Sequence, residues 1–374
     1  MSFRVPQRLS APLILGGIIA LYLLYTLSTA SSPTWVPSLR GSAAPPRVLL
    51  VTAYYPLKKS KHPQSDYDHW LTNLMGQLST DMYIFTSSSY EAHLQGLIAR
   101  AVDSDLTRRR NHTGVFAQRK VYYDTRYSGP LETPPLAEFA KVAQEQWDKD
   151  GEKAYHNPDL YAVWDSKAYF VGEAVRAMAD LKAYDKRAPT YKYVFWEDAG
   201  AMRADHLLQA WPDMDRLDSI FSQGAATVGS DPSAPAPLVM FPLWRKPQAQ
   251  EKAWGEEKGP LGSDIVEGSF FGGTPSSVLW FESTFYALFD RLLAKGFFVG
   301  KDQTVFNLVM SLNPTNFFGP IPREHNDVAN WGANPCGDTW YYYHQWLASA
   351  AELAETEKFR GNACPMVEPE FPFL

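Results

Sequence analysis

Short apolar runs alternate with stretches of helical spacing over most of the chain. Residues 47–53 form a continuous apolar run of strand length, with prolines before it and Pro56 after it. Such a run is typical of a buried parallel strand. Apolar residues then recur at helical spacing from Tyr67 to Leu78, and residues 82–86 form a second short run. This pattern predicts a β-α-β unit.

The middle of the chain has a weaker pattern. Residues 87–158 are polar and charged and contain turn signals, so they predict helices and loops. Regular apolar spacing returns at residues 161–165, and residues 166–184 have one apolar face. We predict a helix over 166–184, with Ser166 or Asp165 as its N-cap.

Further strand signals follow in the second half of the chain. Aromatic and β-branched residues predict a strand at 191–196, and acidic residues come directly after it. Residues 268–273 predict a strand and a turn before another helix. Residues 297–299 predict a strand that leads through residues 300–303 into a short helix. Because strands alternate with helices, we expect an α/β fold, a mixed and largely parallel sheet with helices on both faces.

The longest apolar run lies near the N-terminus. Residues 11–27 are uncharged and almost wholly apolar, and a transmembrane helix needs about 20 apolar residues with a lower limit near ~17. Arg4 and Arg8 precede this run and no acid does. By the positive-inside rule, residues 1–10 are then cytoplasmic and the rest of the chain is lumenal. We predict a type II membrane protein with a signal-anchor at 11–27.

A stalk follows the apolar run, because residues 28–46 are rich in Ser, Pro, Ala and Gly. Residues 47–374 then form the lumenal domain. A short span suits the thin bilayers of the early secretory pathway, so we expect the Golgi or ER membrane. A cleaved signal peptide is the alternative, since Ser28-Thr29-Ala30 fits a cleavage site. Both interpretations deliver the domain to the same compartment.

Composition excludes some partners. The 374 residues have 14% aromatic content and a net charge of −6 with both signs interspersed, which argues for a large core and against a nucleic-acid surface. In an oxidising lumen Cys336 and Cys364 either pair or remain buried free thiols. The sequon at Asn111 predicts an N-glycan. No feature of the sequence indicates an oligomeric state.

Two acidic clusters lie where ligands bind in open α/β sheets, outside the carboxyl ends of strands. Glu197 and Asp198 end the strand at 191–196 and suit Mn²⁺ or Mg²⁺ together with a nucleotide diphosphate. Alternatively, Asp198 caps a helix and pairs with Arg203. Asp302 is a candidate general base, or else a helix N-cap.

A glycine pair adds a third candidate element. Gly272 and Gly273, preceded by Glu267, permit close approach of the backbone to a sugar or phosphate, although such pairs also make simple turns. The sequence contains no GxGxxG, Walker A, HExxH or GxSxG motif. Dinucleotide-binding, P-loop, zincin and α/β-hydrolase classes are therefore disfavoured.

Four segments, in this order and spacing, resemble the HtrL/YibB (WlaTC-like) family of proteins regarded as glycosyltransferases. They are residues 163–167, 195–200 with Arg203, 268–273 and 300–303. The resemblance covers roughly 47–320. It implies a nucleotide-diphospho-sugar transferase fold of the GT-A type.

The resemblance also implies roles for single residues. Asp198 would take the place of the metal-binding acid of GT-A enzymes. Arg203 would help to neutralise the diphosphate, and Lys167 would contact a nucleotide phosphate. Asp302 and Gln303 would face the acceptor or the transferred sugar.

The chain departs from the GT-A pattern in one respect, because no Asp-x-Asp motif ends the strand. Glu197 and Asp198 are adjacent and point to opposite sides of an extended chain, so only one of them would contact a metal. A cation-independent enzyme that uses the two basic side chains stays an alternative. His325 and His344 are candidates to complete a metal site, or are ordinary surface or core histidines.

Together these features predict a membrane glycosyltransferase that moves a sugar from a nucleotide diphosphate donor to a glycan acceptor. Electrostatic stabilisation of the leaving diphosphate would be its main catalytic effect. In an inverting enzyme Asp302 would deprotonate the acceptor. In a retaining one Asp302 or Gln303 would stabilise the sugar's positive charge. Two alternatives stay open: a non-catalytic lectin or scaffold, and a glycoside hydrolase that pairs Asp302 with Glu267 or with an acid of the 197–198 pair.

Overall fold

The computed structural model describes residues 47–57, 60, 62–102, 118–231, 235–321, 341–360 and 369–374. Within these ranges no helix has the length and the apolar character needed to cross a bilayer. Several predicted features lie outside the described residues: the anchor at 11–27, the stalk at 28–46, and Asn111, His325, Cys336 and Cys364.

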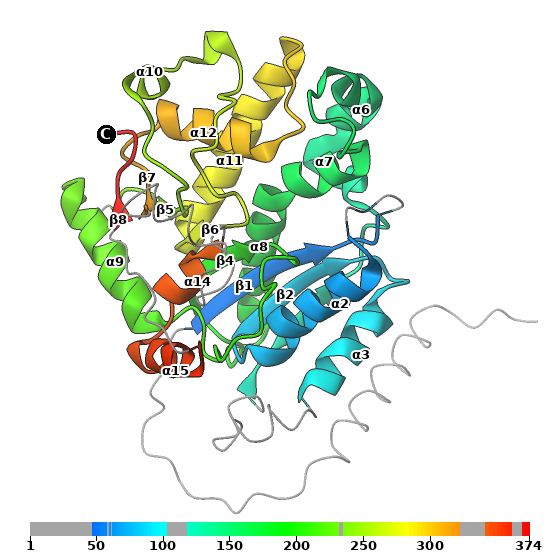
Figure 1. The fold of residues 1–374 in the computed structure, drawn as a ribbon, viewed down its shortest axis with the longest axis vertical. Coiled ribbons are helices and arrows are strands. Elements are labelled where there is room, and N and C mark those ends of the chain that lie inside the picture. The colour runs from blue at the N-terminus through cyan, green and yellow to red at the C-terminus, as the bar shows by residue number, and fades with distance from the viewer. Residues whose placement is uncertain are drawn as a thin grey trace, which may run out of the picture. The chain divides into compact units, whose positions relative to one another are not determined.

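A mixed sheet forms the centre of the domain (Figure 1), and in the described part of the chain it has eight strands in the order β3-β2-β1-β4-β6-β5-β7-β8. The strands are β1 (Arg47–Tyr54), β2 (Asp81–Thr86), β3 (Val121–Asp124), β4 (Tyr191–Glu197), β5 (Val239–Met240), β6 (Phe270–Gly273), β7 (Phe317–Pro320) and β8 (Pro369–Glu370). β3, β2, β1 and β4 pair in parallel. β6 runs antiparallel to β4 and to β5, and β5 pairs in parallel with β7. The expected mixed, largely parallel sheet is confirmed.

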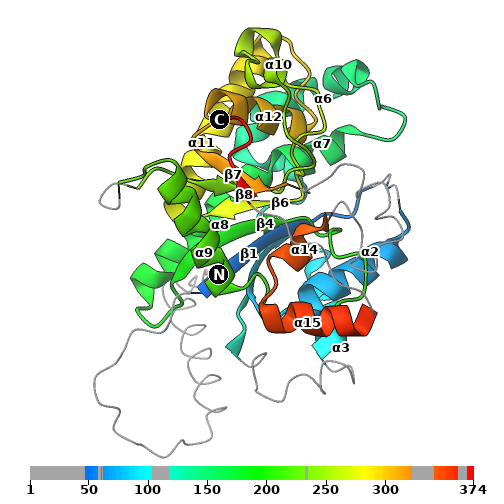
Figure 2. The same cartoon turned by 60° about the vertical axis from the view of Figure 1, so that its left-hand side comes forward.

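Helices cover both faces of this sheet. They are α2 (Gln64–Leu71, continued by a π-helical turn at Thr72–Gly76), α3 (Glu91–Val102), α6 (Ala137–Lys149), α7 (Pro158–Asp165), α8 (Lys167–Tyr184), α9 (Met214–Thr227), α10 (Ala249–Lys252), α11 (Pro275–Ala294), α12 (Asp302–Leu312), α14 (Tyr343–Trp346) and α15 (Ala350–Arg360). Figures 1 and 2 show α6, α7, α11 and α12 on one side of the sheet and α2, α3, α14 and α15 on the other.

The two faces of β1 explain its continuous apolar sequence. Leu49 and Val51 belong to the core beneath α8 and α11, whereas Val48 and Leu50 belong to the core beneath α2 and α3. Successive side chains of a strand point to opposite faces. Since helices cover both faces, the four successive residues 48–51 are all apolar.

The strand order places a crevice beside β1. From β1 the chain first adds β2 and β3 on one side and later adds β4 on the other side. At such a reversal the loops that follow the two central strands separate, and ligands bind in the space between them. The ends of β1 and β4 therefore mark the expected position of a binding site.

The structure corrects two predicted elements. Residues 297–299 form no strand; instead, the amide of Val299 donates a hydrogen bond to Oε1 of Gln146 at 2.9 Å. Asp165 is the last residue of α7, and the Ser166 side chain caps no helix. Its hydroxyl lies 3.0 Å from that of Thr133. At both places the hydrogen bond that we expected from a strand or a helix cap is made instead with a side chain from another segment of the chain.

Four of the strands in the structure were not predicted from the sequence. β3 and β7 have 4 residues each, and β5 and β8 have 2. Strands this short contain too little periodicity to be recognised, and they form because a neighbouring strand offers its hydrogen-bonding edge.

Candidate active site

A cleft of about 560 Å³ lies at the carboxyl ends of β1 and β4, within the size range of small-molecule sites. Its aromatic lining consists of Tyr54, Tyr55, Tyr67, Trp70, Tyr155, Trp164, Trp196 and Tyr341. Its charged and amide-bearing lining includes His62, His156, Lys167, Asp198, Arg203, Glu267, Lys301, Asp302 and Gln303. The position of the cleft matches the reversal of strand order.

Lys167 lies at the base of the cleft, where α8 begins, and its side chain is only 3% exposed. Its Nζ lies 3.0 Å from Oδ1 of Asp198, 3.0 Å from Oδ2 of Asp302 and 3.0 Å from the carbonyl oxygen of Gly268. Burial by itself lowers the pKa of Lys167, but the two carboxylates outweigh burial and raise it above its ordinary value. An ammonium has three N–H donors, so these partners account for all of them.

Asp198 comes directly after β4, and its side chain is 28% exposed, the most exposed of this group. The indole Nε1 of Trp196 donates to its Oδ1 at 2.6 Å and fixes the carboxylate. Burial raises the pKa of Asp198, and Lys167 and Trp196 oppose that rise. A turn follows Asp198, and the next helix begins only at Met214. Asp198 therefore caps no helix and faces the cleft.

Asp302 is the first residue of α12 and is nearly buried. Its Oδ1 accepts a hydrogen bond from the amide of Gln303 at 2.7 Å, while its Oδ2 faces Lys167. The Gln303 side chain donates through Nε2 to the carbonyl of Val266 at 2.5 Å. The structure thus brings Lys167, Asp198, Asp302 and Gln303 from separate segments to one cleft.

Glu197 points to the opposite side of β4, as the alternation of a strand requires. It is fully buried, with the hydroxyl of Tyr343 at 3.3 Å and Nε2 of His344 at 2.7 Å. Burial raises the pKa of Glu197 and lowers that of His344. Both directions favour a neutral, hydrogen-bonded pair. Neither residue lines the cleft, so the structure does not bring them to Asp198 as metal ligands.

Glu267 is a second carboxyl group in the cleft, and it is 1% exposed. Its carboxylate accepts hydrogen bonds from the amide and hydroxyl of Ser269. Burial raises its pKa to about 8, against the lowering effect of Ser269. A carboxyl group that titrates near neutral pH in a cleft is a candidate acid or base. The sequence offered Glu267 as a catalytic carboxyl group only in the hydrolase alternative, and its raised pKa comes from burial, which no local pattern shows.

Arg203 lies at the mouth of the cleft and is exposed. Its guanidinium stacks over the rings of Trp70 at 4.8 Å and Tyr341 at 5.1 Å. Stacking on aromatic faces holds a guanidinium in place while its edge faces outward. The structure therefore places Arg203 where a charged ligand would enter.

Gly272 and Gly273 lie within β6, between β4 and β5, and do not line the cleft. A Cβ added at Gly272 would collide with the carbonyl oxygen of Val194, and one at Gly273 with that of Leu238. Close strand packing explains this glycine pair. Gly268, five positions before Gly273, lines the cleft, as does Gly200 after β4.

A divalent cation fits one position of this site. Mn²⁺ and Mg²⁺ prefer carboxylate, phosphate and water oxygens, and Asp198 presents the only carboxylate of the described cleft residues that is more than slightly exposed. The ammonium of Lys167 already lies between Asp198 and Asp302. It would repel a divalent cation placed between these two carboxylates. Both oxygens of Asp198 contact Nζ of Lys167, Oδ1 at 3.0 Å and Oδ2 at 3.3 Å, so a cation held by Asp198 would lie on the cleft side and share this carboxylate with the ammonium.

No family model and no curated protein matches the chain. Among solved structures, core-mannan synthase A from Aspergillus fumigatus, in an Mn/GDP form, matches with 13% identity over 77% of this chain and 79% of that chain, at a TM-score of 0.38. Values this low do not establish a shared function.

Proposed function

We propose that this chain is a glycosyltransferase that moves a sugar from a nucleotide diphosphate donor to a glycan. The observation that carries the proposal is the ion-paired group of Asp198, Lys167 and Asp302 at the base of an aromatic cleft. Nucleotides bind at such a reversal of strand order in open α/β sheets. The resemblance of four segments to the HtrL/YibB family supports the same activity, and membership of that family stays our prediction.

The donor would lie across the mouth and base of the cleft. Tyr67 offers a flat apolar surface for a base or ribose, and Arg203, which stacks on Trp70, supplies positive charge for the diphosphate. Asp198 would hold a divalent cation, which stabilises the negative charge of the departing diphosphate when bound. Lys167 keeps Asp198 and Asp302 apart at fixed positions, so the site needs little rearrangement before reaction.

Two carboxyl groups of the cleft are able to accept the acceptor proton. Asp302 is our predicted base in an inverting reaction, but its Oδ2 already faces Lys167. Among the described residues the Glu267 carboxylate accepts its hydrogen bonds from Ser269, and burial raises its pKa to about 8 although Ser269 and Lys167 lower it. Proton transfer is most efficient when the pKa lies near the working pH, which favours Glu267 as the second candidate.

Titration calorimetry with UDP and with GDP, each with and without Mn²⁺, tests the proposal. We expect binding of at least one nucleotide that weakens strongly in Asp198→Asn. Absence of binding under all four conditions would sink the transferase and leave the lectin, scaffold or hydrolase alternatives. Given binding, a screen of sugar nucleotides measures transfer, and Asp302→Asn should abolish transfer while nucleotide affinity persists.

We further propose that residues 11–27 anchor the enzyme as a type II protein of the Golgi or ER membrane, with the cleft on the lumenal side. The support is the uncharged apolar run behind two arginines. Alkaline carbonate extraction and protease protection test it: the full chain should stay with the membrane and resist protease until detergent is added. Release of the full chain by carbonate would contradict the anchor.

A further inference from the structure

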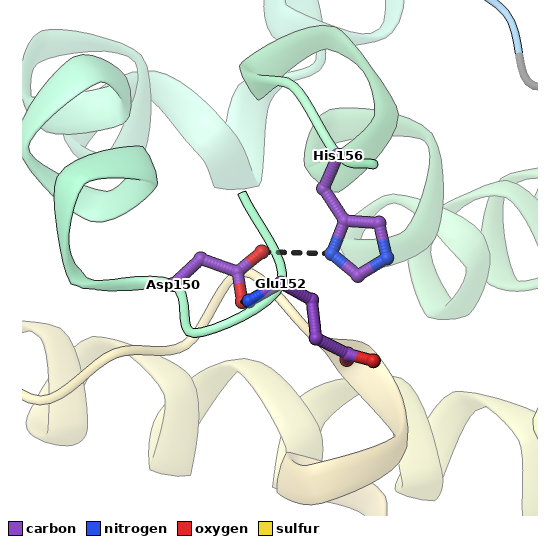
Figure 3. A group of neighbouring side chains, drawn as sticks. All are labelled: Asp150, Glu152 and His156. Atoms are coloured by element: carbon purple, nitrogen blue, oxygen red, sulfur yellow. Dashed lines mark hydrogen bonds and ion pairs between the residues drawn. The ribbon is translucent and has the colours of Figure 1, made fainter. Parts of the chain in front are cut away.

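A second polar group lies at the cleft, on the segment between α6 and α7. Asp150 and His156 form a hydrogen bond of 2.7 Å between Oδ2 and Nδ1 (Figure 3), and His156 is one of the residues that line the cleft. Figure 3 shows the second ring nitrogen, Nε2, on the side away from Asp150. The imidazole is therefore oriented from behind by a carboxylate.

Asp150 is held firmly enough to set that orientation. Its Oδ2 also accepts from the hydroxyl of Tyr161 at 2.6 Å, and its Oδ1 accepts from the amide of Glu152 at 2.8 Å. Burial alone would raise the pKa of Asp150, but these hydrogen bonds and His156 lower it below its ordinary value. In the neutral form of the ring, donation of Nδ1–H to Asp150 leaves Nε2 as a hydrogen-bond acceptor.

Asp150, Glu152 and His156 also bring possible metal ligands within 4.8 Å of one another. However, both oxygens of Asp150 and the Nδ1 of His156 already have partners within the chain. Glu152 is 56% exposed, and its Oε2 pairs with Nζ of Lys301 at 3.1 Å. A metal would have to displace these interactions, so the geometry favours an oriented histidine over a metal centre.

Aromatic side chains flank His156, and we call the part of the cleft lined by Tyr155, His156 and Trp164 the rim. Tyr155 is 71% exposed and lines the cleft. The half-buried Trp164 meets the His156 ring edge-on at 5.1 Å. Exposed aromatic faces beside fixed hydrogen-bonding groups suit a sugar, which has an apolar C–H face and a rim of hydroxyls.

The location connects this group to the reacting centre. Lys301, which pairs with Glu152, directly precedes Asp302 in the chain and also lines the cleft. The rim is thus adjacent to the Lys167–Asp302 pair, on the side of α7 and α12. Arg203 and Trp70 mark a different part of the cleft, formed by α2 and the segment after β4.

We propose that Tyr155, His156 and Trp164 form a subsite for the neutral sugar of the acceptor glycan, with Nε2 of His156 accepting a hydrogen bond from a hydroxyl. Asp150 is a positioning residue that selects the tautomer of His156. This inference rests on the proposed function and assigns the acceptor to the α7 side of the cleft and the nucleotide to the α2 side.

Saturation-transfer NMR tests the subsite with three probes: the methyl glycosides of mannose, galactose and N-acetylglucosamine, each with UDP or GDP present. We expect saturation transfer to at least one glycoside in the wild type. Tyr155→Ala and His156→Ala should reduce it at least about fivefold. Tyr184→Ala is the matched control, because Tyr184 is 92% exposed and lies outside the cleft lining. No signal in the wild type, or equal signals in all variants, overturns the subsite.

Nucleotide affinity is measured on the same samples, so the two proposals fail separately. If the wild type binds a glycoside but neither nucleotide, the transferase proposal is wrong, and the cleft is a sugar-binding site. If the wild type binds a nucleotide, but Tyr155→Ala and His156→Ala leave saturation transfer to the glycoside unchanged, only the subsite proposal is wrong. If Asp150→Asn abolishes the binding of Mn²⁺ or Zn²⁺ while Asp198→Asn keeps it, the metal binds at Asp150, Glu152 and His156. This result also overturns the subsite.

The positioning role of Asp150 has its own spectroscopic test. Two-bond ¹H–¹⁵N correlation of the His156 ring should show the Nδ1–H tautomer in the wild type and a changed tautomer ratio in Asp150→Asn. Tyr161→Phe is the control, since it removes a hydrogen bond to Asp150 and leaves the contact with His156. The same tautomer in Asp150→Asn as in the wild type contradicts this role.

Discussion

The ammonium of Lys167 lies 3.0 Å from Oδ2 of Asp302, although each residue begins a different helix. Both side chains are almost fully buried. A buried charge is tolerated only when an opposite charge and hydrogen bonds compensate it. The pair therefore ties α8 to α12 at the point where the cleft meets the sheet.

Lys167→Met should destabilise the domain by about 3–5 kcal/mol, because it leaves the buried Asp302 and its neighbour Asp198 without their cation. Urea unfolding followed by tryptophan fluorescence measures the loss. Lys141→Met is the control: Lys141 pairs with Glu138 on the surface, both being more than half exposed, and exposed pairs contribute about 0–1 kcal/mol. Equal losses in the two variants would show that the buried pair adds no special stability.

Asp198→Asn should remove the effect of Mn²⁺ on nucleotide affinity, because Asp198 is the cleft carboxylate that fits a cation. Its folding should change little, since Lys167 keeps Asp302 and the Gly268 carbonyl as partners. Calorimetric titration with and without Mn²⁺ reads the first effect, and thermal unfolding reads the second. Asp205→Asn serves as a control, because Asp205 is an exposed acid outside the cleft lining. Persistent Mn²⁺ dependence in Asp198→Asn excludes this residue as the ligand.

Glu267 should make the domain less stable as the pH rises. Its pKa in the folded chain is raised from 4.5 to about 8, so the folded state binds its proton more tightly than the unfolded state. The resulting stabilisation is fully present below pH 4.5 and is lost as the pH rises through about 8. Urea unfolding at several pH values, with EDTA present, should show this decline in the wild type and a flatter profile in Glu267→Gln. Parallel profiles would contradict the raised pKa.

Arg203→Ala should weaken nucleotide diphosphate binding about tenfold, the effect expected for one charged hydrogen bond of ~1.4 kcal/mol or more. Arg203→Lys keeps the charge but loses the flat guanidinium that stacks on Trp70 and Tyr341. It should therefore bind with intermediate affinity. Calorimetry at low and high salt separates the charge from the stacking effect. Wild-type affinity in Arg203→Ala would remove Arg203 from the donor site.

Gly272→Ala and Gly268→Ala should have opposite consequences. A methyl group at position 272 collides with the Val194 carbonyl in the middle of the sheet, so Gly272→Ala should unfold the domain or lower its melting temperature sharply. At Gly268 the nearest atoms lie 3.7 Å away, at Phe306, which is ordinary contact. Gly268→Ala should stay folded while ligand affinity changes. A stable Gly272→Ala that loses nucleotide binding would instead make the pair part of the ligand site.

The longer strands and helices could be predicted because each carries its own pattern. β1 is apolar from residue 48 to residue 51 since both of its faces are buried, and α8 and α11 have helical apolar faces that match the cores they cover. β3, β5, β7 and β8 could not be predicted. Their few residues become strands only where a neighbour supplies hydrogen-bonding partners.

Sequence alone singled out Asp198 and Asp302, because acidic residues stand out where apolar runs end, and the family resemblance added Lys167 and Gln303. The sequence also determined that Glu197 and Asp198 point to opposite sides of the chain. Only the tertiary structure decided that Lys167 joins Asp198 to Asp302, and that burial turns Glu267 into a group titrating near neutral pH. These properties depend on distances between segments remote in the chain and on the exclusion of water, and local sequence patterns encode neither.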